Sequence, residues 1–535
     1  MTTPLLAWLR RSSPVRGVRF SQPDGWRLWP YDELAHLVRR TGAALVSAGV
    51  RPNDVVVVAQ GTGPGFVGTL FGTLLAGGVA SPVTPPTAFR DPGDYAAHLT
   101  RVLETARPAL VVYDAPSVGA LAARVGVPAI GVQSLLELAG GADRTPARPP
   151  SPTALLQFTS GTSGSARAVR IPLAALERNI AGIQSWLAMT PEDPTASWLP
   201  PHHDMGLVGC LLSPVVTGAD LWLMSPAEFV RRPLRYLSCF GQHGARLTAM
   251  PPFGLDHLVR RVRPDDLTAM DFRDWRAVIV GAERIWPACL ERFAALCGPY
   301  GLRRQALLPA YGLAEATLAV TGLSLAEGWT AHHDGDDAAP VVGCGRPLPG
   351  VSVSVVDDTG RRLAAGETGE IVVGGRCVGD GYAPGVPPDR STSPPEPATS
   401  FAGGTVHTGD IGFLHEGQLF VLGRQGDSFK IRGIAVHAAD LDTVLGTELG
   451  LVSGSAVTVL GYDSGSPTVV AVLEQARQDR AEAAVDVLRA RVSPARVVAL
   501  RVPMGTIPRT TSGKPRRREL WQAYRSGALT GSARR

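Results

Sequence analysis

The chain has 535 residues, of which 44% are hydrophobic and 19% are charged, so an intrinsically disordered protein is excluded and two or more folded units are expected. The formal net charge of +5 indicates either a mildly basic surface or a site for an anionic ligand. Six cysteines lie far apart with no CxxC pair, which argues against a disulfide scaffold or a zinc ribbon and predicts a reducing cytoplasm as the location.

The N-terminal part of the chain alternates helix and strand patterns. Apolar residues recur on one helical face over residues 31–50, the run VVVVA at 55–59 predicts a fully buried strand, and Phe66–Ala76 is expected to form a second helix. The stretch from Val55 to Phe89 carries no charge, but glycines and prolines interrupt it so often that a buried strand, loop and helix are expected instead of a membrane span. This alternation predicts parallel sheets with helices packed on them.

The pattern changes toward the C-terminus. Two stretches rich in glycine, proline and polar residues, 138–152 and 388–404, are expected to be loops. From about residue 427 onward, short strands and helices are expected at 468–473, 479–492, 497–502 and 515–529. This part therefore predicts a compact α+β unit of about 110 residues.

One loop has the composition of a phosphate site. Residues 155–169, LLQFTSGTSGSARAV, read as an apolar strand that runs into a small-residue loop. The loop offers backbone N–H groups and hydroxyls without bulky side chains, as a loop that wraps a phosphate requires. A Walker A pattern is absent, and an ordinary Ser/Gly turn also fits. The candidate phosphate contacts are Thr159, Ser160, Gly161, Thr162, Ser163 and Gly164.

Eight further segments follow this loop. They are SWLPPHHDMGLVG (197–209), VIVGAERI (278–285), AYGLAEATLAV (310–320), GCGRPLPG (343–350), GETGEIVVGG (366–375), HTGDIGFL (407–414), GRQGDSFKIRG (423–433) and PRTTSGKPRRREL (508–520). Together with the loop, and in this order, they resemble the adenylate-forming superfamily over roughly residues 25–525. That superfamily includes acyl-CoA synthetases, fatty acyl-AMP ligases, peptide-synthetase adenylation domains and luciferase.

The resemblance implies a fold and a reaction. The fold would be α/β, with a large N-terminal domain of mixed and parallel sheets packed by helices over residues 1–423, a hinge at 424–426 and a small mobile α+β domain over 427–535. The activity would form an acyl-CoA thioester from a carboxylic acid through an acyl-AMP, with ATP, CoA and Mg²⁺ as the small molecules involved. Neither nucleic acid nor a membrane span is expected.

The resemblance also assigns roles on the nucleotide side. The carboxylate of Glu315 would hold Mg²⁺ against the triphosphate. The remaining nucleotide contacts would be Tyr311 and Gly312 beside the adenine, Ala282 and Glu283 at the border of the base, Asp410 on the ribose, and Arg424 on the ribose or phosphate. Simpler interpretations stay open, namely a surface carboxylate for Glu315, a turn residue for Asp410 and a surface ion pair for Arg424.

Lysine is rare enough to be informative. Of 52 basic residues only Lys430 and Lys514 are lysines. By resemblance, Lys514 would bridge the carboxylate and the α-phosphate in the first step, and Lys430 would serve the second. His203 would line the acyl pocket and gate the thiol tunnel, although a simply packed histidine is an alternative. A zinc site at residues 202–204 is not expected, because no distant ligands accompany these residues.

The chain also departs from the family pattern. The phosphate loop normally ends in Pro-Lys-Gly, but here Arg167 takes the place of the lysine and both neighbours are changed. Gly426 replaces the usual hinge residue, and the segment between Gly322 and Gly343 is short for a fatty acyl-AMP ligase. Three alternatives therefore accompany the complete ligase. They are an enzyme that only transfers preformed acyl-AMP to CoA, an acyl-AMP ligase that loads a carrier-protein thiol, and a non-catalytic adenylate-binding protein.

Overall fold

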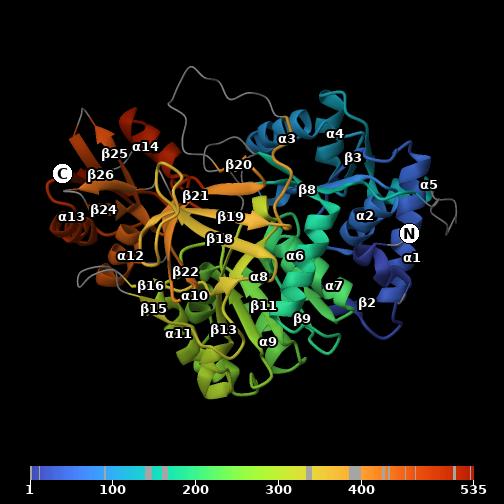
Figure 1. Cartoon of the computed structure of the whole chain (residues 1–535), viewed down its shortest axis with the longest axis horizontal. Helices are drawn as coiled ribbons and strands as arrows, with labels where there is room; N and C mark the ends of the chain where they lie inside the picture. Colours follow the sequence, from blue (N-terminus) through green and yellow to red (C-terminus); the bar gives the residue numbers. More distant parts are fainter. Residues whose placement is uncertain are drawn as a thin grey trace.

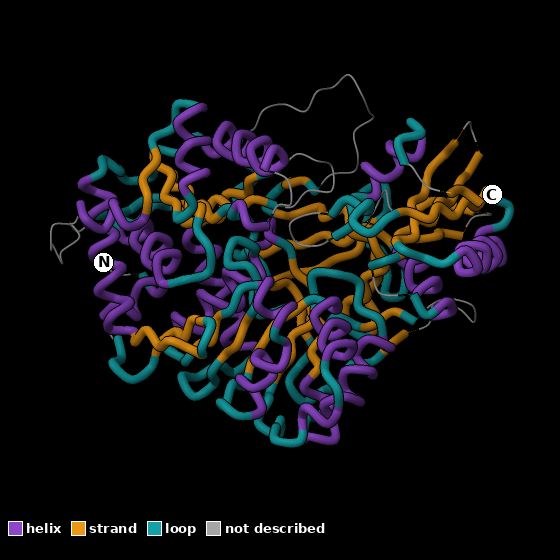
Figure 2. Tube along the Cα trace, turned by 180° about the vertical axis from the view of Figure 1, so that it is seen from behind, coloured by secondary structure: helices purple, strands orange, loops and turns teal. Residues whose placement is uncertain are grey.

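A computed structural model gives the fold of the chain. It describes residues 3–10, 12–88, 92–138, 148–159, 167–332, 340–384, 399–424, 428–431, 434–451, 454–463, 466–509, 514–529 and 532–534. Figure 1 shows the N-terminal helices at one end of the molecule and the C-terminal elements at the other. Seen from behind, strands run through the middle of the molecule and helices lie mainly outside them (Figure 2).

The first sheet contains the strand that the sequence predicted at residues 55–59, and the two helices predicted on either side of that strand cover this sheet. Its order is β6-β5-β3-β4-β7-β8, parallel except for the last pair. The strands are β3 (Val55–Ala59), β4 (Val79–Pro82), β5 (Leu110–Tyr113), β6 (Ala129–Gly131), β7 (Thr153–Phe158) and β8 (Ala168–Pro172). The covering helices include α1 (Tyr31–Ser47), α2 (Pro64–Leu75), α3 (Pro92–Ala106) and α4 (Pro116–Arg124). The buried valines of β3 confirm the expected strand.

The second sheet has nine strands and forms the base of the candidate site. Its order is β17-β14-β13-β12-β11-β9-β10-β1-β2, with parallel pairing from β1 to β13. The strands are β1 (Gly17–Gln22), β2 (Gly25–Pro30), β9 (Thr195–Ser197), β10 (Leu221–Leu223), β11 (Leu247–Met250), β12 (Ala277–Val280), β13 (Leu307–Gly312), β14 (Ala319–Gly322) and β17 (Arg346–Pro347). Helices α6 (Leu173–Trp186), α9 (Pro233–Gly241), α10 (Pro252–Arg261) and α11 (Pro287–Cys297) accompany it. Buried aromatic rings hold this core, such as Phe240 stacked on Trp275 at 3.8 Å.

A third sheet follows and corrects one prediction. It is made of β18 (Val351–Val356), β19 (Gly369–Gly375), β20 (Ser400–Ala402), β21 (Thr405–His415) and β22 (Gln418–Arg424), all antiparallel. Residues 400–402 had been expected to be loop, which is wrong, because β20 pairs with β21 across a two-residue turn. Gly403 and Gly404, with φ of 56° and 78°, adopt the left-handed conformation that such a turn requires.

The C-terminal unit, as we call residues 428–534, packs around a four-stranded sheet. The sheet has the order β25-β26-β27-β28, and a small hairpin of β23 (Ser428–Ile431) and β24 (Ile434–His437) precedes it. Its other elements are α12 (Ala438–Leu449), β25 (Ala456–Asp463), β26 (Ser466–Glu474), α13 (Gln478–Val492), β27 (Arg496–Val502), α14 (Arg517–Arg525) and β28 (Ser532–Arg534). The predicted strands and helices of this unit are confirmed, but β28 was not foreseen.

Alternation along β26 explains the two layers of the C-terminal unit. Val469 and Ala471 pack in the core under α12 and α13, whereas Val470 and Val472 belong to the core under α14. Successive side chains of a strand point to opposite faces, so both faces of this sheet are covered. The predicted α/β class with a smaller α+β part is therefore confirmed.

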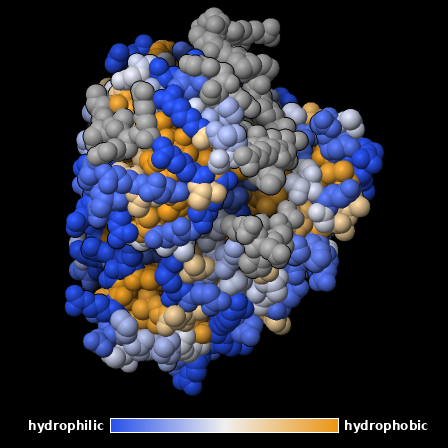
Figure 3. All heavy atoms as spheres, turned by 90° about the vertical axis from the view of Figure 1, so that its left-hand side faces the viewer, coloured by the Kyte–Doolittle hydropathy of each residue, from blue (hydrophilic) through white to orange (hydrophobic). Residues whose placement is uncertain are grey.

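Seen from the side that lies at the left of Figure 1, hydrophilic residues cover most of the visible surface (Figure 3). Within the described part of the chain, no helix has both the length and the apolar character needed to cross a membrane. All six cysteines are buried and form no disulfide, as their spacing predicted.

Candidate active site

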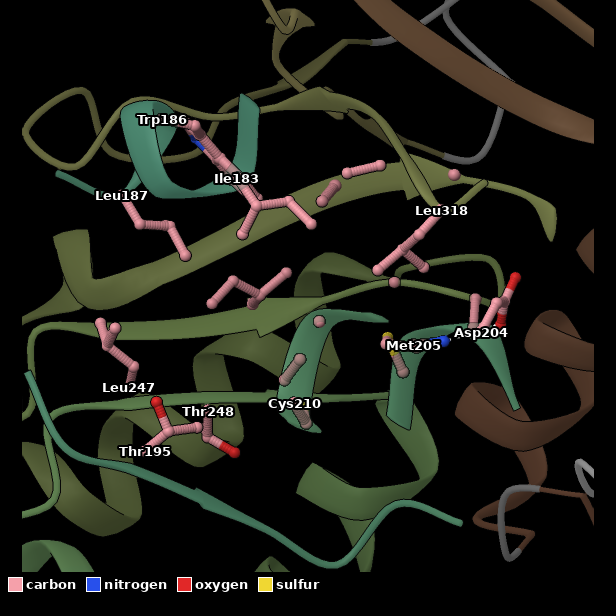
Figure 4. Close-up of a pocket in the computed structure, with 18 of the residues that line it drawn as sticks. Ile183, Trp186, Leu187, Thr195, Asp204, Met205, Cys210, Leu247, Thr248 and Leu318 are labelled. Carbon is pink, nitrogen blue, oxygen red and sulfur yellow. Dashed lines mark hydrogen bonds between the residues drawn. The ribbon is translucent and has the colours of Figure 1, made fainter. Parts of the chain in front are cut away.

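An elongated cavity lies between the nine-stranded sheet and the helices above it (Figure 4). The space between its walls is about 740 Å³, part of it open to solvent. Leu187, Leu247 and Thr195 lie toward one end, and Asp204, Met205 and Leu318 lie toward the other. The lining is Ile183, Trp186, Leu187, Met189, Thr195, Asp204, Met205, Gly209, Cys210, Leu247, Thr248, Ala249, Ile279, Gly281, Ala282, Ala310, Tyr311, Gly312, Leu318 and Ala319.

Small residues make room for this cavity, and one large residue fixes its wall. A Cβ atom at Gly209 would lie 3.2 Å from the Leu318 side chain, and both residues line the cavity, so a larger residue at position 209 would crowd this part of the lining. The indole of Trp186 donates a hydrogen bond to the Leu323 carbonyl at 2.8 Å. A Cβ atom at Gly322 would come within 2.2 Å of that indole. The wall formed by Trp186 therefore depends on the absence of a side chain at Gly322.

The loop after β12 contributes Gly281 and Ala282 to the cavity lining, and we call the end of the cavity near this loop and Asp204 the mouth. Ala282 lines the cavity and has a φ of 67°, a left-handed conformation that alanine rarely adopts. Next to it, burial raises the pKa of the Glu283 carboxyl, and the positive charges of Lys514 and Arg509 oppose that rise. The predicted base-contacting pair, Ala282 and Glu283, is thus held at the opening of the apolar cavity.

Lys514 acts electrostatically on a second carboxylate at the same mouth. Burial raises the pKa of Asp204, whereas the Met205 backbone N–H and the Lys514 ammonium lower it. The Asp204 carboxylate accepts the hydrogen bond from the Met205 N–H at 2.8 Å and so begins the buried helical segment Met205–Leu212 (η3). Lys514 is half-buried, and its positive charge acts on both Asp204 and Glu283.

A second polar group joins the nine-stranded sheet to the third sheet. The Tyr311 hydroxyl donates to the Asp410 carboxylate at 2.6 Å, and the guanidinium of Arg424 lies 3.4 Å from the same carboxylate. Asp410 and Arg424 are also register partners in the β21–β22 hairpin. Three residues predicted from separate motifs are therefore adjacent, and Tyr311 and Gly312 also line the cavity.

Arg167, which takes the place of the usual lysine of the phosphate loop, contacts residues from distant segments of the chain. Its guanidinium stacks 4.2 Å from the Tyr382 ring and donates to the Thr399 carbonyl at 3.0 Å. The hydroxyl of Tyr382 in turn donates to the Glu315 carboxylate at 2.5 Å. Glu315 is buried, with 6% of its surface exposed. Tyr382 therefore links the phosphate-loop cation to the carboxylate predicted to hold Mg²⁺.

The two histidines occupy a tight turn before η3. The His203 N–H donates to the Pro200 carbonyl at 3.1 Å, and its own carbonyl accepts from the Leu207 N–H at 2.7 Å. Its ring lies 4.5 Å from that of His202, whose burial lowers its pKa well below the ordinary value. In this conformation the cavity is lined by Asp204 and Met205 and not by His203.

Several predicted residues lie outside the described part of the chain. These are Ser160, Gly161, Thr162, Ser163 and Gly164 of the phosphate loop, and Gly426. Thr159 is described, and its N–H donates to the Arg167 carbonyl at 2.9 Å across the base of the loop. Lys430 lies in β23, where it pairs with Ala435, and its side chain is not described. Most of the segment between Gly322 and Gly343 is described, apart from residues 333–339.

The donor set fits magnesium better than a transition metal. Among the described residues, no three His, Cys, Asp or Glu side chains are grouped to hold a metal ion. Mg²⁺ is commonly held by one or two carboxylates together with substrate phosphates. A buried carboxylate such as Glu315, which Tyr382 links to Arg167, suits that arrangement.

Comparison with known proteins identifies the family. A family model described as AMP-binding enzyme matches residues 11–383. The chain belongs to the AMP-binding enzyme family. This AMP-binding enzyme is 30% identical to a putative acyl-CoA synthetase of Caulobacter vibrioides, with 93% of this chain and 89% of the relative covered. It is 28% identical to JamA, a medium-chain-fatty-acid–[acyl-carrier-protein] ligase of Moorena producens, with 93% and 90% covered.

A solved structure supports the same assignment. It comes from a study of fatty acyl-adenylate ligases from E. coli and L. pneumophila, is 26% identical and aligns with a TM-score of 0.87 over 99% of this chain and 98% of that chain. The predicted superfamily is confirmed, and this AMP-binding enzyme is an acyl-activating, adenylate-forming enzyme.

The contacts of Tyr382 make a stability prediction. Tyr382→Phe removes the hydrogen bond to Glu315 but keeps the ring under Arg167, whereas Tyr382→Leu removes both contacts. A hydrogen bond to a charged group contributes about 1.5–3 kcal/mol, and a partly buried cation–π contact adds about 1 kcal/mol. We expect both variants to lower the free energy of unfolding in urea, with the leucine variant lower. Equal stability of the two variants would show that the Arg167 stacking contributes nothing.

Proposed function

We propose that this enzyme activates a carboxylic acid with an apolar chain as its acyl-AMP and then transfers the acyl group to the thiol of CoA. In the first step a carboxylate oxygen attacks the α-phosphorus of ATP, and pyrophosphate leaves. In the second step the thiol sulfur attacks the acyl carbon, and AMP leaves. In the second step, the thiol of a carrier protein is the alternative acceptor of the acyl group.

The observation that supports the first step best is the position of Lys514. It brings a positive charge from the C-terminal unit to the mouth of an apolar cavity, beside Asp204 and Glu283. An ammonium held about 4 Å from a negative oxygen is worth about 4 kcal/mol at an effective dielectric constant of 20. A cation at this place suits the point where a substrate carboxylate and an α-phosphate meet.

The other residues would bind and orient the reactants. The acyl chain would lie in the cavity, with its carboxylate toward Asp204 and Ala282. Asp410, supported by Tyr311 and Arg424, would accept hydrogen bonds from the ribose hydroxyls. When bound, Mg²⁺ would neutralise phosphate charge, and Glu315 would hold it. For the second step, the C-terminal unit would rotate about residues 424–426 and present Lys430.

The contacts of Arg167 favour a second candidate, in which the enzyme only transfers a preformed acyl-AMP. The guanidinium is already engaged by Tyr382 and Thr399, so reaching the terminal phosphates of ATP requires it to leave both. Acyl-AMP lacks those phosphates and makes no such demand. Small misplacement of a catalytic contact can cost about 10²-fold in rate.

The cavity length predicts a dependence on the acyl group. Leu187→Phe adds bulk at the end of the cavity opposite Asp204, so acyl chains long enough to reach this end should be excluded. We expect short straight-chain acids to react as with the unchanged enzyme and longer ones to lose about tenfold or more. The measurement is acyl-CoA formation from a series of acyl-AMP substrates of increasing chain length. A uniform loss at all lengths would place the acyl chain elsewhere.

The two lysines should separate the half-reactions. Lys514→Ala should reduce adenylation about 10²–10³-fold and spare transfer from supplied acyl-AMP, because it removes a charge needed only in the first step. Lys430→Ala should do the opposite. Arg525→Ala removes an exposed cation at the end of α14 and serves as the control. Pyrophosphate exchange measures the first step. An equal loss of both steps in either lysine variant would contradict its role.

The decisive experiment supplies one acyl group in two forms. Free acid with ATP and Mg²⁺ is compared with preformed acyl-AMP, each with CoA and, separately, with a phosphopantetheinylated carrier protein. Comparable rates from both forms support the complete ligase. Product from acyl-AMP alone supports the second candidate. If neither form yields a thioester with either acceptor, the proposed function is wrong.

A further inference from the structure

We propose that Arg284 and Asp440 form a latch between the large N-terminal part and the C-terminal unit, and that this latch positions Lys514 for the first step. The inference rests on the proposed function, because it assigns these two residues to the acyl-AMP-forming arrangement. Neither residue touches the cavity. Both are therefore positioning residues, which act through the placement of the C-terminal unit.

Arg284 is unusually well enclosed for a cation. It follows Glu283 in the loop after β12, and only 9% of its side chain is exposed. Its guanidinium donates to the Leu422 carbonyl at 2.7 Å, near the end of β22, and lies 4.3 Å over the Trp286 ring. These contacts hold Arg284 on the large part of the molecule, on the side where the chain passes into the C-terminal unit.

The partner side chains come from the beginning of α12. The Asp440 carboxylate forms an ion pair with Arg284, and Asp440 lies in the first turn of that helix. His437, immediately before α12, packs on the end of β22, where a Cβ atom at Gly423 would lie 3.3 Å from its Nδ1. Burial, aided by the charge of Arg284, lowers the pKa of His437 to about 4, so its imidazole is neutral at pH 7. His437 therefore does not repel Arg284, which pairs with Asp440.

The cost of burying the two charges makes the pair suited to a reversible contact. Burial raises the pKa of Asp440 to about 6 despite the neighbouring Arg284, and Asp442 adds to the rise. Burial also lowers the pKa of Arg284. Attraction in a buried pair is largely offset by lost hydration, so the pair adds little net stability. Removing one partner, however, leaves a buried charge uncompensated and strongly disfavours the docked arrangement.

The latch and the reactive lysine meet at adjacent residues. Glu283 experiences the charges of Lys514 and Arg509, and Arg284 binds Asp440. One short loop of the large part thus forms an ion pair with the C-terminal unit through Arg284, and its neighbouring residue Glu283 interacts electrostatically with Lys514. Loss of the latch should therefore withdraw Lys514 without altering the cavity, the Asp410 group or the acyl-AMP contacts of the large part.

The test combines a distance measurement with the two half-reactions. Fluorophores are attached at Ala295→Cys on α11 and Asp486→Cys on α13, both exposed, while the six natural cysteines are buried. The variants are Asp440→Asn, Asp440→Arg and the exchange Arg284→Asp with Asp440→Arg. Asp479→Asn is the matched control, since its pair with Arg477 is solvent-exposed.

We expect Asp440→Asn and Asp440→Arg to shift the energy-transfer distribution and to slow adenylation by on the order of tenfold, with transfer from acyl-AMP unchanged. The charge exchange should recover part of both losses relative to Asp440→Arg. The control should match the unchanged enzyme. Melting temperatures identify any variant that fails to fold, and Asp440→Asn, which is nearly isosteric, then carries the test.

Two results would overturn the latch. One is an unchanged energy-transfer distribution in both Asp440 variants. The other is an equal loss in both half-reactions that the charge exchange does not recover. Energy transfer needs no catalysis, so it still tests the latch if the enzyme proves unable to form acyl-AMP. In that case the proposed first step is wrong, but the energy-transfer measurement still decides whether Arg284 and Asp440 hold the two parts together.

Discussion

The contact between the loop after β12 and the C-terminal unit determines which chemistry the cavity can support. The cavity is apolar, and its mouth holds two half-buried carboxyl groups, Asp204 and Glu283, whose charged forms burial disfavours. The compensating cation, Lys514, belongs to the other part of the molecule. The site is therefore complete only while the two parts are in contact, and a rotation of the C-terminal unit would change the charge at the mouth.

The large part has its own preorganised polar groups, built from residues that precede the C-terminal unit. Asp410 is oriented by Tyr311 and by its strand partner Arg424, and Glu315 by Tyr382. Each carboxylate is tied to a tyrosine hydroxyl, which limits its movement and leaves oxygen atoms for a ligand. In the proposed reaction, the binding groups are thus fixed on the large part, whereas the cation, Lys514, comes from the C-terminal unit. This division suits a reaction with two steps at one place.

Much of the fold followed from the sequence because its signals are local. The valine run of β3 and the periodic helix α13 depend on neighbouring residues, and so do the motifs that contain Tyr311, Asp410 and Arg424. Contacts between distant segments had no such signal. The partnership of Arg167 with Tyr382 joins positions more than 200 residues apart, and β20 was missed because the proline-rich stretch before it dominated the pattern.

The packing of Trp186 against Gly322 ties the shape of the cavity to a residue that is not part of its lining. The indole lies where it does because position 322 has no side chain. Any larger residue there would push the ring toward the cavity and shorten the space available to a ligand. Conversely, a smaller residue at position 186 would open a recess behind it. Positions 186 and 322, which lie in different elements, therefore together set the volume of the cavity. Selection or engineering at these two positions could alter the accepted ligand without changing the polar residues at the mouth.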